Sequence, residues 1–197
     1  MPRPAPSAPL LPGLLEADPG LPEGFRWRPE LITAGEEAAL AAWLRTLEFK
    51  PYEHQGYLAH RQVVSFGLRY DDRTRRVGPT APIPDQLLGL RGKVAAFAGL
   101  DAEALAHVLI NEYRPGVQIG WHRDKPQFED VAGVSLLSPC LFRLRRRTAT
   151  GFVRAGLRLE PRSVYVIQGP ARSQWEHSIP PVEALRYSVT FRTLRTR

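Results

Sequence analysis

Apolar positions in the first half of the chain recur at helical spacing. Within residues 30–47 they lie three or four residues apart, which places them on one helix face: these are Leu40, Trp43, Leu44 and Leu47. Thr33 stands just before this run and is a residue type that favours a helix N-cap. Segments 84–97 and 101–106, each short and bounded by Pro or Gly, predict two further helices.

After about residue 107 the pattern changes to short runs of Val, Ile, Leu, Phe and Tyr separated by turn residues, which is typical of strands. We expect strands at residues 108–113, 131–137, 140–144, 157–159, 163–168 and 187–194. Strands at this spacing behind early helices predict an α+β domain whose core is a sandwich, a barrel or a jelly roll.

The last of these strands alternates in character. One face carries Arg186, Ser188, Thr190 and Arg192, and the other carries Tyr187, Val189 and Phe191. The two arginines lie roughly 20 Å apart at Cα, so long side chains converging from both ends can hold one dicarboxylate between them. Taken alone, the same pattern also fits the charged outer face of an edge strand.

Two other polar pairs share a strand face. Asn111 and Tyr113 offer an amide and a phenol, both suited to a carboxylate ligand. His122 and Asp124 are also two residues apart, and His177 follows an expected strand later in the chain. Two histidines and one carboxylate leave coordination positions open, which suits a non-haem Fe(II) oxygenase better than a structural zinc site. By itself, however, a His-x-Asp pair is common, and a lone histidine is usually a surface or core residue.

Together, the order Asn111-x-Tyr113, His122-x-Asp124, His177 and Arg186-x5-Arg192 resembles the AlkB family of Fe(II)- and 2-oxoglutarate-dependent dioxygenases over residues 107–194. The resemblance implies a double-stranded β-helix (jelly roll) core, and it implies Fe(II), 2-oxoglutarate and O2 as cofactor and co-substrates. It implies the iron ligands His122, Asp124 and His177. It also implies 2-oxoglutarate contacts from Asn111, Tyr113, Arg186, Ser188, Thr190 and Arg192.

The activity that this resemblance implies is oxidative demethylation. Hydroxylation of an N-alkyl carbon gives an unstable hemiaminal, which expels an aldehyde. The expected substrate is an N-alkylated base in single-stranded DNA or RNA, and the alternative is the same chemistry on a protein or a small molecule. Residues 125–128 are less acidic than in well-known DNA-repair members, and motifs near residues 161–167 and 171–177 look like a bacterial subgroup.

The segment 52–70 resembles the substrate-recognition lid that precedes the core in this family. Its aromatic and cationic side chains suit base stacking and phosphate contact, and the candidate substrate-binding residues are Tyr57, Arg61, Arg69 and Tyr70. The alternative is a hairpin that packs its aromatic side chains into the core, which we favour for Phe66.

Charge agrees with a polyanionic partner without deciding it. The chain has 27 Lys and Arg against 20 Asp and Glu, a formal net charge of +7, which attracts nucleic acid. A solvated arginine-rich surface gives the same balance. The same two alternatives apply to a second basic cluster, for which a solvated turn is the default: Arg143, Arg145, Arg146 and Arg147.

Composition also sets the expected organisation. Residues 1–23 are rich in Pro and predict a flexible arm, whereas residues 24–197 predict one domain, with helices and lid in 24–106 and the catalytic core in 107–194. One cysteine, Cys140, allows no intramolecular disulfide, and no apolar run approaches the roughly 18–20 residues of a membrane span. We therefore expect a cytoplasmic monomer without membrane contact.

Overall fold

The computed structural model describes residues 20–54, 57–71 and 73–195, so most of the proline-rich segment 1–23 lies outside the described residues. The early elements are β1 (Phe25–Arg28), α1 (Ala34–Leu44), β2 (Lys50–His54), β3 (Tyr57–Phe66), β4 (Leu68–Asp71), β5 (Arg76–Pro79) and α2 (Asp85–Ala98). The later elements are β6 (His107–Tyr113), β7 (Ile119–His122), β8 (Phe128–Leu136), β9 (Cys140–Thr148), β10 (Gly151–Leu159), β11 (Val164–Ile167), α3 (Gly169–Gln174), β12 (Glu176–Ile179) and β13 (Arg186–Leu194).

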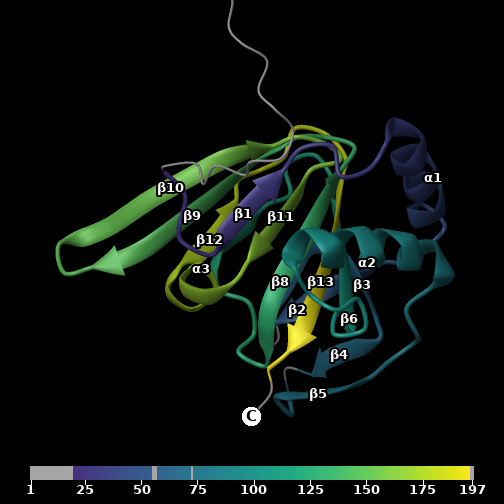
Figure 1. The fold of residues 1–197 in the computed structure, drawn as a ribbon, viewed down its shortest axis with the longest axis horizontal. Helices are drawn as coiled ribbons and strands as arrows, with labels where there is room; N and C mark the ends of the chain where they lie inside the picture. Colours follow the sequence, from purple (N-terminus) through teal and green to yellow (C-terminus); the bar gives the residue numbers. More distant parts are fainter. Residues whose placement is uncertain (1–19, 55–56, 72, 196–197) are drawn as a thin grey trace, which may run out of the picture.

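Two antiparallel sheets form the core. The larger has seven strands in the order β1-β11-β8-β13-β6-β3-β2, and the smaller has four in the order β10-β9-β12-β7 (Figure 1). From β6 to β13 the chain passes repeatedly from one sheet to the other, which is the arrangement of a double-stranded β-helix. A separate hairpin, β4–β5, follows the lid strand β3. The predicted fold class, an α+β jelly roll with supporting helices, is confirmed.

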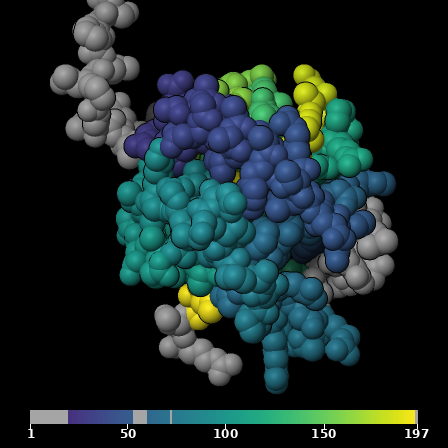
Figure 2. Space-filling view, turned by 90° about the vertical axis from the view of Figure 1, so that its right-hand side faces the viewer, coloured from purple at the N-terminus to yellow at the C-terminus, as the bar shows by residue number. Residues whose placement is uncertain are grey.

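The two longer helices cover the outer face of the seven-stranded sheet (Figures 1 and 2). Leu44 of α1 and Leu87 and Val94 of α2 are fully buried in one cluster with apolar side chains of the sheet. No helix in the described part of the chain is long and apolar enough to span a membrane.

The helix beginning at Ala34 was predicted correctly. Thr33 is its N-cap: the Thr33 hydroxyl accepts the Glu36 N–H at 3.2 Å, and the Glu36 carboxylate accepts the Thr33 N–H at 2.9 Å. This reciprocal pair is a capping box. The second predicted helix is α2, which ends at Gly99 with a left-handed φ of 72°.

The third predicted helix, at residues 101–106, was wrong. This segment forms only a turn, in which the Asp101 carboxylate accepts the Glu103 N–H at 3.0 Å and the Asp101 carbonyl accepts the Ala104 N–H at 3.2 Å. Leu105 is fully buried, and the chain enters β6 two residues later. The side chain and carbonyl of Asp101 therefore accept hydrogen bonds from backbone N–H groups in a local turn that competes with a helix.

A second apolar cluster lies between the two sheets, beneath the site described below. It includes Phe142 and Tyr165, whose ring centroids are 4.8 Å apart. Gly133 of β8 lies against the Tyr165 ring, and a Cβ at this position would collide with that ring. A glycine is therefore required for the close approach of the tyrosine to the strand.

Candidate functional site

The structure brings His122, Asp124 and His177 together at the end of the small sheet. His122 is the last residue of β7, and it pairs in antiparallel register with His177 of β12. The ligand atoms of all three lie within 4.8 Å of one another, and the His177 Nε2 lies 3.6 Å from the Asp124 Oδ2. His122 Nδ1 is 2.9 Å from the Gly120 carbonyl oxygen. A proton on Nδ1 donates to that oxygen, which leaves Nε2 free to bind a metal.

The electrostatics of this cluster suit a cation. Burial and the neighbouring His122 lower the pKa of His177 to about 3, and burial also lowers the pKa of His122. For Asp124, burial alone would raise the pKa, but Arg192 and the two histidines hold it below its usual range. Two neutral imidazoles and one ionised carboxylate are the protonation states that metal binding requires.

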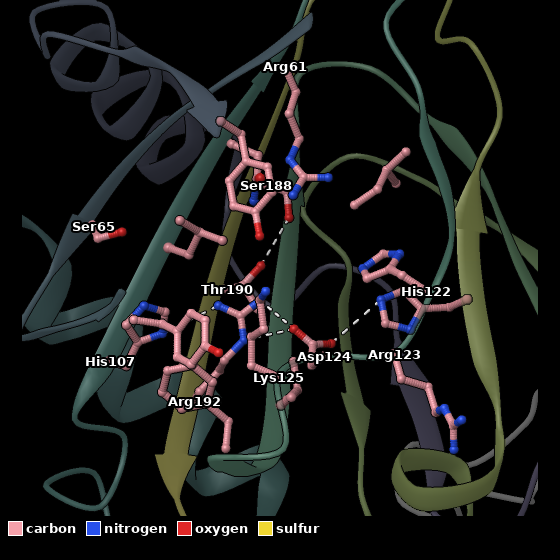
Figure 3. Close-up of a pocket in the computed structure, with 18 of the residues that line it drawn as sticks. Arg61, Ser65, His107, His122, Arg123, Asp124, Lys125, Ser188, Thr190 and Arg192 are labelled. Atoms are coloured by element: carbon pink, nitrogen blue, oxygen red, sulfur yellow. Dashed lines mark hydrogen bonds and ion pairs between the residues drawn. The ribbon is translucent and has the colours of Figure 1, made fainter. Parts of the chain in front are cut away.

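Arg192 is the main partner of this carboxylate. Its Nε and Nη2 donate to the Asp124 Oδ1 at 3.0 and 2.7 Å. Figure 3 marks both contacts. Its Nη1 lies 3.3 Å from the Nδ1 of His107, a buried histidine that the sequence analysis did not single out. Burial first, and Arg192 second, lower the pKa of His107 well below its usual value, so its neutral ring can accept this bond.

Arg186, at the other end of the β13 strip, is fully buried and incompletely satisfied. Its Nε donates to the Ser135 hydroxyl at 3.1 Å, and its guanidinium carbon lies 5.0 Å from the centre of the Tyr113 ring. Among the described residues, Nη1 and Nη2 meet no hydrogen-bond partner. A buried cation with two unmet donors is costly unless an anion binds it. The site therefore fits one carboxylate of 2-oxoglutarate at this position.

A cavity lies beside the His-Asp-His cluster, and the other residues expected to bind 2-oxoglutarate line it, whereas Arg186 is not among its lining residues. Asn111 and Ser188 are directly opposite each other on paired strands, and Arg186 is opposite Tyr113. The residues of the strip that line the cavity together with the His-Asp-His cluster are Asn111, Tyr113, Ser188, Thr190 and Arg192.

The lid also contributes side chains to this cavity, and its strand β3 lies next to β6 in the seven-stranded sheet. Arg61 from β3 and Arg69 and Tyr70 from β4 line it, and so does Tyr52 of β2. The side chain of Tyr57 lies outside the described residues. Phe66 packs on the helical core instead, with its ring 6.5 Å from that of Trp43, as we favoured from the sequence.

Several residues of the site were missed or undervalued. Arg172 in α3 donates to the carbonyl oxygens of Asp124, Lys125 and Phe128 at 3.2, 2.7 and 2.7 Å, and so holds the loop after the metal candidate. His107 could have been found, because the alternation that places Asn111 and Tyr113 on one face continues back to it. Ser135 gave no local signal, because only the pairing of β8 with β13 brings it to Arg186.

The second basic cluster lies on the β9–β10 hairpin, which projects from the body of the molecule (Figure 1). Arg145 forms an ion pair with Glu176 at 2.6 Å, and its guanidinium carbon lies 4.4 Å from the centre of the Trp121 ring and 4.5 Å from that of Phe152. Arg143 donates to the Ser178 hydroxyl at 3.0 Å. These contacts favour a structural role for both side chains over a free basic patch.

Comparison with known proteins agrees with this geometry. A family model described as the 2OG-Fe(II) oxygenase superfamily matches residues 26–192. The chain is 26% identical over 194 residues to the alkylated DNA repair protein ALKBH8 homolog of Arabidopsis thaliana, covering 85% of this chain and 53% of that protein. It is 30% identical over 155 residues to the mitochondrial alpha-ketoglutarate-dependent dioxygenase alkB homolog 7 of Bos taurus, covering 77% of this chain and 65% of that protein. The chain thus spans between about half and two thirds of the length of these relatives.

Solved structures share the fold at lower identity. The structure of OsALKBH1 has a TM-score of 0.61 at 18% identity, covering 86% of this chain and 96% of that one. A Pseudomonas putida prolyl-4-hydroxylase has a TM-score of 0.58 at 20% identity, covering 88% and 94%. These likenesses show the jelly-roll architecture. The match over residues 26–192 shows that the chain belongs to the 2OG-Fe(II) oxygenase superfamily, and AlkB homologues are among its relatives.

Proposed function

We propose that this chain oxidatively dealkylates N-alkylated bases in single-stranded or flipped-out nucleic acid. The observation that carries the proposal is the shared cavity: lid residues Arg61, Arg69 and Tyr70 line it together with the His-Asp-His cluster. A target held by the lid would thus lie next to the metal. Nucleic acid suits this lid because aromatic rings stack on bases and arginines meet phosphates.

In this proposal His122, Asp124 and His177 hold Fe(II). Arg186 and Arg192 bind the two carboxylates of 2-oxoglutarate, with Asn111, Tyr113, Ser188 and Thr190 between them. When bound, Fe(II), 2-oxoglutarate and O2 would supply the oxidant that converts a substrate C–H bond to C–OH. On an N-alkyl group, this hydroxylation gives a hemiaminal, whose C–N bond then breaks. The hydroxyl proton passes to the base nitrogen, and the alkyl carbon leaves as an aldehyde.

The residues of the chain position the reactants. Arg192 keeps Asp124 ionised and fixes its orientation through two hydrogen bonds. Arg172 holds the backbone of the loop that carries Asp124. Tyr70 lines the cavity, and the centre of its ring lies 4.7 Å from the Lys125 ammonium nitrogen. This geometry supports a rigid metal site beneath a cationic and aromatic substrate entrance.

The test is a panel of single-stranded DNA and RNA oligonucleotides, each with one methylated base, analysed by mass spectrometry while succinate is measured in parallel. The iron-loaded protein should remove the methyl group from at least one member. His122→Ala should abolish both readouts. Combined Arg69→Ala and Tyr70→Ala should abolish demethylation but leave succinate formation in the absence of nucleic acid at the wild-type level.

A matched control is Arg158→Ala, because Arg158 is exposed and pairs with Glu160 away from the cavity. This variant should match the wild type in both assays. Succinate formation by a protein that demethylates no oligonucleotide would contradict the nucleic-acid proposal. The alternative, a protein or small-molecule substrate for the same iron chemistry, would then replace it.

A further inference from the structure

The charged side chains that line the substrate cavity are mostly cationic. Among the described residues that line it, the only carboxylate is Asp124, and this group is already paired with Arg192. The remaining charged lining residues are Arg61, Arg69, Arg123 and Lys125. The described lining of this cavity therefore carries an excess of positive charge.

Arg61 is the most informative of these residues, because it is buried. It is 8% exposed, and its guanidinium carbon lies 3.9 Å from the centre of the Tyr52 ring. Its Nε is buried and has no acceptor among the described residues. Figure 3 shows its guanidinium directed into the cavity, on the same side as Ser188. A buried cation with an unmet donor is costly, and an oxygen acceptor on a bound ligand would satisfy this donor.

The aromatic contact with Tyr52 also fixes the orientation of Arg61. A guanidinium stacked on a ring has fewer rotamers open to it, and its planar set of donors is then presented in one direction. Arg61 is therefore pre-organised to donate to an oxygen acceptor of the substrate rather than to act as a mobile surface charge.

Methylated bases fall into two electrostatic classes. Adenine methylated at N1 and cytosine methylated at N3 carry a formal positive charge near neutral pH. Uracil or thymine methylated at N3 and guanine methylated at N1 are neutral. Beside the methylated nitrogen, at C4 of uracil or thymine and at C6 of guanine, each has a carbonyl oxygen where the cationic base has an amino group. A guanidinium donates readily to such oxygens, as it does to the O6 of guanine. It repels a cationic ring brought into the same desolvated cavity.

We propose that Arg61 determines substrate specificity, and that the chain acts on neutral, carbonyl-bearing methylated bases in preference to cationic ones. This inference rests on the proposed function. The inference specifies the chemical class of the base. Arg61 would select this class by donating hydrogen bonds to neutral bases and by repelling cationic ones.

The experiment compares kcat/KM for matched single-stranded oligonucleotides. One pair contains 3-methyluracil or 3-methylcytosine at the same position, and the other contains 1-methylguanine or 1-methyladenine. The wild type should favour the neutral member of each pair by about tenfold or more, since 1.4 kcal/mol corresponds to a factor of ten. Arg61→Gln should reduce this ratio towards one, mainly by losing activity on the neutral base and gaining it on the cationic base.

Two further variants separate specificity from folding. Arg61→Lys keeps the positive charge, so it should still disfavour the cationic bases even if its hydrogen bonds to the neutral bases are weaker. Arg158→Gln, on the exposed face of β10, should leave the ratio unchanged. Succinate formation without nucleic acid, measured for each variant, reports whether the iron site has stayed intact.

Equal activity on both classes, or a preference of the wild type for the cationic bases, would overturn the inference and leave the proposed function standing. A wild-type ratio that survives in Arg61→Gln would overturn the assignment to Arg61. Absence of activity on all four oligonucleotides, with succinate formation intact, would instead overturn the proposed function and this inference with it.

Discussion

At the residue scale, the two arginines of β13 differ in what they contact. Arg192 donates twice to Asp124, whereas Arg186 is buried with two nitrogens that meet no partner among the described residues. We propose that both bind carboxylates of 2-oxoglutarate. Only Arg192, however, also holds a residue of the proposed metal site, so loss of each arginine should have different consequences.

We predict that Arg186→Met weakens 2-oxoglutarate binding by about 10- to 100-fold, because each lost charge-assisted contact costs about 1.5–3 kcal/mol. It should leave metal affinity unchanged. Arg192→Met should weaken both, since Asp124 loses its two donors. Anaerobic calorimetry with Mn(II) in place of Fe(II), then with 2-oxoglutarate, measures the two affinities separately. Unchanged metal affinity in Arg192→Met would show that the Asp124 contact is not needed for metal binding.

The buried histidines predict the pH dependence of the metal-free protein. Burial, with His122 beside it, lowers the pKa of His177 from 6.5 to about 3, so between these values the unfolded chain binds more protons than the folded one. The free energy of unfolding should therefore fall as the pH decreases below 6.5, with His177 contributing up to about 1.4 kcal/mol per pH unit.

Urea unfolding at several pH values between 6.5 and 4 measures this slope. His177→Gln should make the slope shallower, because the replacement does not titrate. An equal slope in His177→Gln and the wild type would contradict the assignment of a buried neutral imidazole.

At the element scale, the β9–β10 hairpin shows how charged side chains can stabilise a projecting sheet. The sequence predicted strands only at residues 140–144 and 157–159, but both strands extend to nine residues, as far as the turn at residues 149 and 150. Arg145 links this extension to the other two strands of the small sheet, through Glu176 of β12 and Trp121 of β7, and it also contacts Phe152 across the hairpin.

We predict that Arg145→Ala lowers the free energy of unfolding by about 1–2 kcal/mol, since it removes a partly buried ion pair and two cation–π contacts. Arg158→Ala, which breaks the exposed pair with Glu160, should cost less than about 0.5 kcal/mol. Chemical denaturation of both variants tests the difference. An equal loss of unfolding free energy in both variants would mean that Arg145 is only a solvated charge in a surface turn.

At the scale of the whole molecule, the net charge of +7 and the cationic cavity predict salt-dependent binding of single strands. Each phosphate that the protein neutralises should contribute a slope of about −0.7 in log K against log salt concentration. Fluorescence anisotropy with an unmodified oligonucleotide measures this slope. Arg69→Ala should make it less steep by about one phosphate equivalent, while affinity that does not change with salt would contradict phosphate contact.

The sequence by itself determined the features that depend on near neighbours in the chain. The capping box at Thr33, the shared face of His122 and Asp124, and the alternation from Arg186 to Arg192 all follow from helix or strand geometry over a few residues. The last two of these features, together with Asn111-x-Tyr113 and His177, were enough to predict the family and the jelly-roll fold, because four linked motifs in one order are far more specific than any single one.

Only the tertiary structure decided which distant side chains meet. Arg192 contacts Asp124 across 68 positions of the chain, and Ser135 reaches Arg186 only through the pairing of β8 with β13. The lid gives another example of what the tertiary structure decides. Arg61 faces the cavity, whereas Phe66, five residues later on the same strand, packs under the helices. Strand alternation predicts that two such residues point to opposite faces, but sheet order and register decide what each face covers.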